Sequence, residues 1–215
     1  PRSCSPSSPR NRPSTGSSDS TFRLWDASTG KERNVLSIPS EYLDPIHNAS
    51  INAQAKFTSD GKLLITVTSG DGYVIEQPAF VWEVQSGRIL QAFRHEGGSI
   101  WDIDITPDDN YAVTASYDNS SALWDIHSGK RIQTFHGHST RVLKAIINKN
   151  GRLLATASGD GALLIWQTDT GRKIHEKQLN SGLVNLELSH NGRFIASGSG
   201  TDDKAVIEIW DLVEG

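Results

Sequence analysis

What the sequence lacks narrows its function before any pattern is considered. It contains one cysteine, Cys4, which excludes an intramolecular disulfide framework and a multi-cysteine zinc site. It has no methionine, position 1 included, so we expect a processed chain or a piece of a longer one. No apolar run approaches the roughly 18 residues that span a bilayer, and no signal-peptide core follows the N-terminus. We therefore expect an intracellular protein, cytoplasmic or nuclear, without a membrane partner.

Positive charge and catalytic motifs are also scarce. The 21 Lys and Arg residues are outnumbered by 25 Asp and Glu residues, so nucleic acid is not an expected partner. The sequence contains no P-loop, GxGxxG, HExxH, GxSxG or CxxC motif. His136 and His138 are close together, but the sequence places no third metal ligand near them. We predict that the protein is not an enzyme and has no metal or cofactor.

Composition favours a chain of short strands joined by turns. Hydrophobic residues make up 36% of the sequence, low for a packed α/β enzyme, and there are 19 glycines. Residues 1–13 differ from the rest, with four prolines, three arginines and no large aliphatic residue. Such a segment cannot bury enough apolar surface to offset the entropy of folding. We expect a disordered tail at 1–13 and a folded region at 14–215.

Five tryptophans mark a repeat within the folded region. Successive ones are separated by 57, 42, 42 and 44 residues, and each is followed five positions later by glycine. The pairs are Trp25 and Gly30, Trp82 and Gly87, Trp124 and Gly129, Trp166 and Gly171, and Trp210 and Gly215. A fixed spacing at all five positions indicates an internal repeat.

Each repeat has the pattern of several short antiparallel strands. Within it, apolar residues recur with a period of two and turn residues interrupt them. For the repeat at 141–178 we expect strands at 142–147, 153–158, 162–166 and 172–178. The same order recurs at 51–94 and 99–136, without the fourth strand at 183–211, and in part at 14–38. Glycine at the turn between the third and fourth strands suits a tight hairpin, because glycine accepts positive φ.

The residues that end the third strand carry a family resemblance. They are Trp25-Asp26, Trp124-Asp125 and Trp210-Asp211, and Gly137-His138 precedes the first strand of one repeat. In these dipeptides and in its period, the chain resembles the WD40-repeat family over 14–215. The resemblance implies an all-β fold, a partial WD40-type β-propeller of about four to four and a half blades of four-stranded antiparallel sheet.

The resemblance also implies a hydrogen-bonded network inside each blade. In the family, a histidine before the first strand, an aspartate after the second, a hydroxyl of the second and the tryptophan are linked. For the repeat at 141–178 and the residues just before it, these positions hold His138, Asp160, Thr156 or Ser158, and Trp166. In 99–136 they hold Asp118, Ser116 and Trp124, with Glu96 in place of the histidine, so we expect a weaker network there. Since buried polar groups need partners, we interpret these groups as structural rather than catalytic.

The ends of the repeat array allow two architectures. The chain could be an open arc from a larger propeller, with apolar blade faces and strand edges exposed. Alternatively, a strand within 31–38 could complete the last blade and close a four-bladed ring. We favour the fragment, because a four-bladed ring requires more curvature than the family normally shows.

Two insertions distinguish the repeat at 51–94 and predict a binding surface. One lengthens the loop before Trp82, and the other occupies 39–50. In a propeller both loops emerge on the same face. Their aromatic and aliphatic residues are Tyr42, Leu43, Ile46, Tyr73, Val74, Ile75 and Phe80. These side chains either contact a partner or pack against one another. Arg141 should lie on the same face, as a further contact or a solvated charge, whereas we expect Trp101 to pack between blades.

From these features we expect a non-catalytic scaffold that presents propeller loops to protein or peptide partners. The alternative is a regulatory or substrate-receptor WD module of a larger protein, of the sensor or ubiquitin-ligase type. The missing blades of a parent chain, or self-association, are further possible partners. An enzymatic propeller is disfavoured because no catalytic constellation is present.

Overall fold

The computed structural model describes residues 14–16, 21–42, 52–69, 77–179, 183–189, 192–201 and 204–212. The tail expected at 1–13 lies outside them. The chain divides into two compact units, which we describe separately. The first comprises the described residues up to Ile100 together with His127–Gly129. The second comprises Trp101–Ile126 and the described residues from Lys130 onward.

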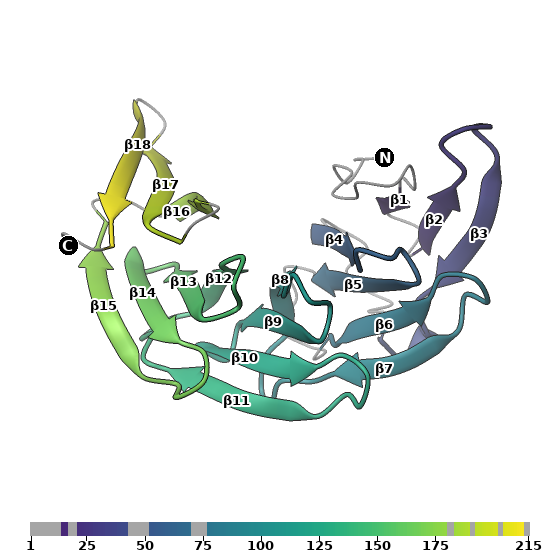
Figure 1. Ribbon diagram of the computed structural model, residues 1–215, viewed down its shortest axis with the longest axis horizontal. Helices are drawn as coiled ribbons and strands as arrows, with labels where there is room; N and C mark the ends of the chain where they lie inside the picture. The colour runs from purple at the N-terminus through teal and green to yellow at the C-terminus, as the bar shows by residue number, and fades with distance from the viewer. Residues whose placement is uncertain are drawn as a thin grey trace. The chain divides into compact units, whose positions relative to one another are not determined.

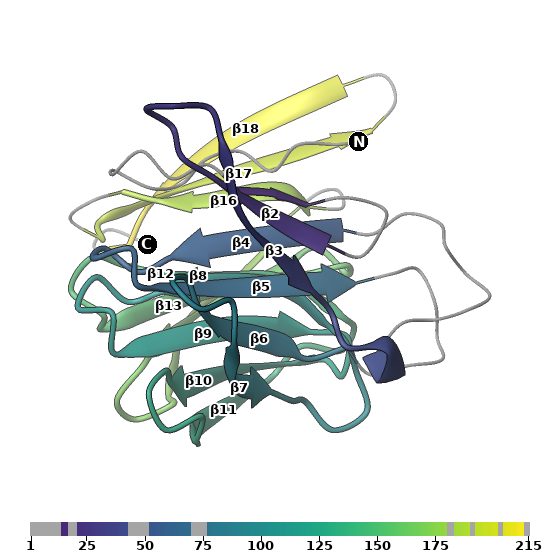
Figure 2. The ribbon, with the colours of Figure 1, turned by 90° about the vertical axis from the view of Figure 1, so that its right-hand side faces the viewer.

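The first unit contains two antiparallel sheets, with the strand orders β1-β2-β3 and β4-β5-β6-β7. Its elements are β1 (Ser14–Gly16), β2 (Thr21–Trp25), β3 (Glu32–Ser37), the 3-10 helix η1 (Ser40–Tyr42), β4 (Asn52–Phe57), β5 (Leu63–Ser69), β6 (Ala79–Glu83) and β7 (Ile89–Phe93). Figure 2 shows β4, β5, β6 and β7 lying side by side in chain order. The core of this unit contains Phe22, Leu24, Leu36, Ile38, Leu64, Phe80 and Trp82.

The second unit contains two four-stranded sheets and one of three strands (Figure 1). The first sheet is β8 (Ile100–Ile105), β9 (Tyr111–Ser116), β10 (Ser120–Asp125) and β11 (Arg131–His136). The next is β12 (Val142–Ile147), β13 (Leu153–Ser158), β14 (Ala162–Gln167) and β15 (Lys173–Gln178). The third is β16 (Leu183–Leu188), β17 (Phe194–Thr201) and β18 (Lys204–Asp211). The sequence predicted the four strands of 141–178 to within one residue at each end, and the all-β class is confirmed.

Burial on both faces explains why the third strand of a repeat is apolar throughout. In β14, Leu164 and Trp166 pack with residues of β9, β10 and β11. Leu163 and Ile165 point to the opposite face and pack with Leu186 and Ile195 of the following sheet. Alternate residues of one strand therefore enter two different cores, which leaves no polar side to the strand.

The last sheet lacks this second cover in the described part of the second unit. Ile207 and Ile209 of β18 correspond in register to Leu163 and Ile165, yet they are 78% and 71% exposed. A strand within 31–38 was the candidate to complete this sheet. That strand is β3 of the first unit, and it pairs with β2.

Glycine is required at the turn between the third and fourth strands because of its backbone conformation. Gly87 and Gly129 both have φ of 71°, a conformation that side chains other than glycine rarely adopt. In addition, a Cβ on Gly87 would lie 2.6 Å from the Asn34 amide of the preceding sheet, and one on Gly129 would lie 2.5 Å from the Gln91 amide. The Gln91 amide also donates a hydrogen bond to the His127 carbonyl at 2.9 Å. Because these amides end flexible side chains that could move aside, the positive φ is what requires glycine at this turn.

No helix within the described ranges has the length and apolar character needed to cross a membrane.

Candidate functional site

Four blades satisfy the indole N–H of their tryptophan in the same way. Each indole donates to a hydroxyl on the neighbouring second strand. The pairs are Trp82 with Thr66 at 2.7 Å, Trp124 with Thr114 at 2.8 Å, Trp166 with Thr156 at 2.8 Å, and Trp210 with Ser197 at 3.4 Å. In each case the hydroxyl lies two residues after the cross-strand partner of the tryptophan, and so on the same face of the sheet.

This register corrects one predicted residue and settles another. Trp124 pairs across the strands with Ala112, so Thr114 is the nearest hydroxyl on its face and Ser116 is too far along the strand. The prediction that Ser116 is the hydroxyl linked to Trp124 in this network is therefore wrong. Ser116 accepts a hydrogen bond from the backbone N–H of Asp118 at 3.2 Å instead. In the next blade, where two hydroxyls were candidates, Thr156 is the partner of Trp166.

His138 extends the network of its blade in one direction. Its Nε2 lies 2.7 Å from the Thr156 hydroxyl, and its side chain is buried. Its buried Nδ1 has no hydrogen-bond partner among the described residues. Burial lowers the pKa of His138 to about 4, although the negative charge of Asp160 opposes the shift. His138 is therefore neutral at physiological pH.

Asp160 belongs to a second, separate group of hydrogen bonds. Its carboxylate accepts from the Ser158 and Ser139 hydroxyls, and from the Ala162 N–H at 2.9 Å. Burial alone would raise the pKa of Asp160, but these hydrogen bonds outweigh it and lower the pKa to about 2. No hydrogen bond joins Asp160 to His138 within the described part of the chain, so the predicted single chain of four groups is divided in two.

The blade at 99–136 places its aspartate in a local turn. Asp118 accepts hydrogen bonds from the Ser120 N–H at 2.8 Å and from the Ser120 hydroxyl at 2.7 Å. Glu96, which the spacing places at the histidine position, is exposed. The adjacent His95 is 1% exposed.

Of the seven loop residues predicted to form a binding surface, the structure describes Tyr42 and Phe80. Phe80 is buried in the core of the first unit, on β6, so its prediction as a partner contact is wrong. Its ring meets that of Tyr42 edge to face at 5.3 Å and that of Trp82 at 5.8 Å. The Arg94 guanidinium lies 4.8 Å above the Tyr42 ring and donates to its hydroxyl. Tyr42, Phe80 and Arg94 therefore belong to one group of contacting side chains within the first unit. The remaining candidates, Leu43, Ile46, Tyr73, Val74 and Ile75, lie outside the described residues.

A second aromatic cluster lies on the second unit. Trp101 at the start of β8 stacks on Tyr117, which follows β9, with a centroid distance of 4.9 Å and an interplanar angle of 18°. The Arg141 guanidinium, just before β12, lies 4.8 Å from the Tyr117 ring centroid. Trp101 and Tyr117 are half-buried and Arg141 is exposed. Trp101 is thus less buried than expected for a residue between blades. We call these three residues the Trp101–Arg141 cluster.

The sequence contained a signal for Tyr117 that spacing alone does not exploit. Aligned on the tryptophans, Tyr117 occupies the position of Gly159 in the next repeat. A large aromatic at a turn where the neighbouring repeat has glycine is a departure from the pattern. Departures of this kind at loop positions are a reason to consider a residue as a candidate contact.

Two carboxylates of β8 in the second unit have structural partners. Asp102 is 3% exposed and accepts from the Ala145 N–H at 3.1 Å and from Lys144 at 3.3 Å. Burial raises the pKa of Asp102, and the positive charge of Lys144 opposes that rise. Asp104 similarly accepts from the Ile147 N–H at 3.2 Å. These carboxylates accept hydrogen bonds from N–H groups of β12, an edge strand of its sheet.

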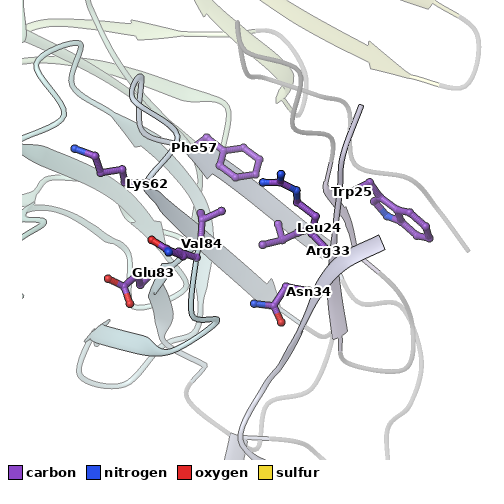
Figure 3. Close-up of a pocket in the computed structure, with 9 residues that line it drawn as sticks. Leu24, Trp25, Arg33, Asn34, Phe57, Lys62, Glu83 and Val84 are labelled. Carbon is purple, nitrogen blue, oxygen red and sulfur yellow. The ribbon is translucent and has the colours of Figure 1, made fainter. Parts of the chain in front are cut away.

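A pocket of about 480 Å³ lies in the first unit (Figure 3). Its lining residues are Leu24, Trp25, Arg33, Asn34, Phe57, Lys62, Glu83, Val84 and Gln85. Arg33 is paired with Asp26 at 3.2 Å, and Lys62 with Asp60 at 3.0 Å. Figure 3 shows the Trp25 indole pointing away from Phe57. Since carboxylates of the chain already neutralise both cations, we assign no ligand to this pocket.

Within the described ranges, no three His, Cys, Asp or Glu side chains are grouped to hold a metal ion.

Comparison with known proteins identifies two of the repeats. The family model described as WD domain, G-beta repeat, matches residues 87–125 and residues 129–167. Each match begins at the turn glycine and ends one residue after the tryptophan. No curated protein matches the chain significantly.

Proposed function

Since this chain is a WD-repeat protein built from β-propeller blades, we propose that it acts as a non-catalytic scaffold for protein or peptide partners. WD repeats typically mediate protein–protein interaction. We further propose that partners bind the second unit at the Trp101–Arg141 cluster.

The composition and support of this cluster carry the proposal. Tryptophan, tyrosine and arginine are the residue types that contribute most to binding energy at protein interfaces. Here they lie at strand ends, where β8, β9 and β12 hold their backbones in place. A partner would bind without first ordering a loop, which lowers the entropic cost of association.

The burial of the titratable groups supports a role without catalysis. His138 and Asp102 are buried within the blades, and each is bonded to a group of the sheet framework. A general acid or base must reach a substrate proton, which neither group can do from its position.

Selection from a random dodecapeptide phage library on the immobilised full chain tests this proposal. We expect enriched peptides to bind Trp101→Ala about tenfold more weakly than wild type, because the apolar anchor is removed. Ile132→Ala is the matched control, since Ile132 is 53% exposed on the outer strand β11. A thermal melt of both variants checks their folding.

The proposal fails if no peptide is enriched, or if enriched peptides bind Trp101→Ala as tightly as Ile132→Ala. A peptide that loses affinity only for the Ile132 variant would place the partner on the outer strand instead.

A further inference from the structure

Arg141 has no anionic partner among the described residues, in contrast to two arginines whose charge is paired. Arg23 pairs with Glu32 at 2.9 Å, and Arg193 pairs with Asp211. The Arg141 side chain makes neither a hydrogen bond nor an ion pair with the described residues. Its guanidinium contacts the Tyr117 ring, while its backbone carbonyl accepts from the Gly159 N–H at 3.1 Å.

Stacking on Tyr117 leaves the N–H donors of Arg141 available. A guanidinium that contacts the face of an aromatic ring retains its N–H donors for a further ligand. These donors match the two oxygens of a carboxylate, which guanidinium binds in a bidentate manner. Because the stacking already restricts the side chain, less entropy is lost on binding than for a freely rotating arginine.

Trp101 supplies an apolar surface on the same tyrosine that Arg141 contacts. It is half-buried and stacks on the same tyrosine, 4.9 Å between ring centroids. A ligand that satisfies both features combines a carboxylate with an adjacent apolar side chain.

We infer that the Trp101–Arg141 cluster recognises a linear peptide in which a single Asp or Glu stands beside an apolar residue. The carboxylate pairs with Arg141, and the apolar side chain packs on Trp101. This inference rests on the proposed function and specifies the partner of that site.

The surrounding charges favour one carboxylate over a run of them. Asp118 is next to Tyr117 in sequence, and Asp160 follows the glycine that bonds to the Arg141 carbonyl. Both carboxylates accept hydrogen bonds from N–H groups of their own turns. Their negative charges would repel the carboxylates of a bound peptide. A polyanion would meet this repulsion repeatedly, whereas one carboxylate placed at Arg141 gains more than it loses.

Three octapeptide libraries provide the test, identical except for a fixed central glutamate, glutamine or phosphoserine. The flanking positions are drawn from uncharged residues. Each library is passed over the immobilised full chain as wild type, Arg141→Gln, Arg141→Lys, Trp101→Ala and Arg94→Gln. The last is the matched control, because Arg94 also stacks on a tyrosine at 4.8 Å.

We expect wild type to retain the glutamate library about fivefold better than the glutamine library at low salt. That preference should disappear in Arg141→Gln, persist in Arg94→Gln, persist in part in Arg141→Lys, and weaken at high salt.

Equal retention of both libraries by wild type, or a preference that survives Arg141→Gln, would overturn the inference. Much stronger retention of the phosphoserine library would also overturn it, in favour of a phosphate ligand. If all libraries are retained equally but Trp101→Ala releases them, the carboxylate preference is wrong and the proposed function stands. If wild type retains none, both are wrong.

Discussion

Each unit contains an arginine that lies over a tyrosine ring, but the two pairs differ in their other contacts. In the first, Arg94 lies 4.8 Å from the Tyr42 ring, and in the second, Arg141 lies 4.8 Å from the Tyr117 ring. Arg94 also donates to the Tyr42 hydroxyl, whereas the guanidinium of Arg141 has no hydrogen-bond partner among the described residues.

The second contact of each tyrosine explains the difference. Tyr42 meets Phe80, which is buried, so that the pair extends the core of the first unit. Tyr117 meets Trp101, which is only half-buried. An arginine–tyrosine pair is therefore not a binding site by itself. It becomes a candidate when its arginine is unpaired and its aromatic support lies at the surface.

Among these variants, Phe80→Ala should lower the free energy of unfolding the most, because it removes the buried ring that contacts Tyr42 and Trp82. Removing a buried phenylalanine costs about 3–5 kcal/mol through lost transfer energy and a residual cavity. Tyr117→Ala, on the half-buried cluster of the second unit, should cost about 1 kcal/mol. Denaturant unfolding followed by tryptophan fluorescence measures both. Comparable losses in the two variants would show that the clusters do not differ in burial as described.

Lowering the pH should weaken the second unit through His138. Its pKa is about 4 in the folded protein, below its ordinary value of 6.5, so the unfolded chain takes up the proton first as pH falls. Stability is therefore complete above pH 6.5 and declines between pH 6.5 and 4, by an amount on the order of 3 kcal/mol.

The matching variant is His138→Gln, compared with wild type by denaturant unfolding at a series of pH values. It should lack most of the decline in this window. An unchanged decline would assign it to other groups. Asp160, whose pKa is lowered from 3.8 to about 2, loses its stabilising contribution only between those two pH values, below this window.

Replacing the hydroxyl partners of the tryptophans should destabilise the two units by different amounts. Thr66→Val leaves the buried Trp82 indole without a partner, which costs about 1–2 kcal/mol. Thr156→Val removes the partner of both Trp166 and His138, so we expect a loss about 1 kcal/mol larger. Chemical denaturation of each variant gives the two values. Equal losses would mean that the contact between His138 and Thr156 adds nothing to stability.

The arginines themselves should show the smallest effect on stability. Arg94→Ala removes a hydrogen bond and a stacking contact and should cost about 1 kcal/mol. Arg141→Ala should change the free energy of unfolding by less than about 0.5 kcal/mol, because the side chain is exposed and unpaired. Thermal melts compare the two. A larger loss for Arg141→Ala would assign it a structural role.

The sequence predicted the strands well because their signal is periodic. Trp166 and the alternating residues around it specify β14 and its neighbours, and the tryptophan spacing extends that pattern along the chain. Hydrogen-bond partners were harder to predict, since Ser116 and Thr114 differ only by one step along the same face. That choice depends on strand register, which sequence spacing alone does not determine.

The candidate site was predicted only in part. Arg141 was a candidate contact from its position, but Tyr117 was missed and Trp101 was expected in the core. The long loops drew attention to Phe80, although it lies within a strand and is buried. Loop length indicates where surface variation occurs, but burial depends on packing between strands distant in sequence.

The most direct test of the account is hydrogen–deuterium exchange of the full chain, with and without a saturating selected peptide. The account predicts slower exchange on binding at residues 100–102, 116–119 and 139–142, and no change at residues 40–42 or 92–95. Protection at Tyr42 and Arg94 without protection at Trp101, Tyr117 and Arg141 would contradict it, and would assign partner binding to the first unit.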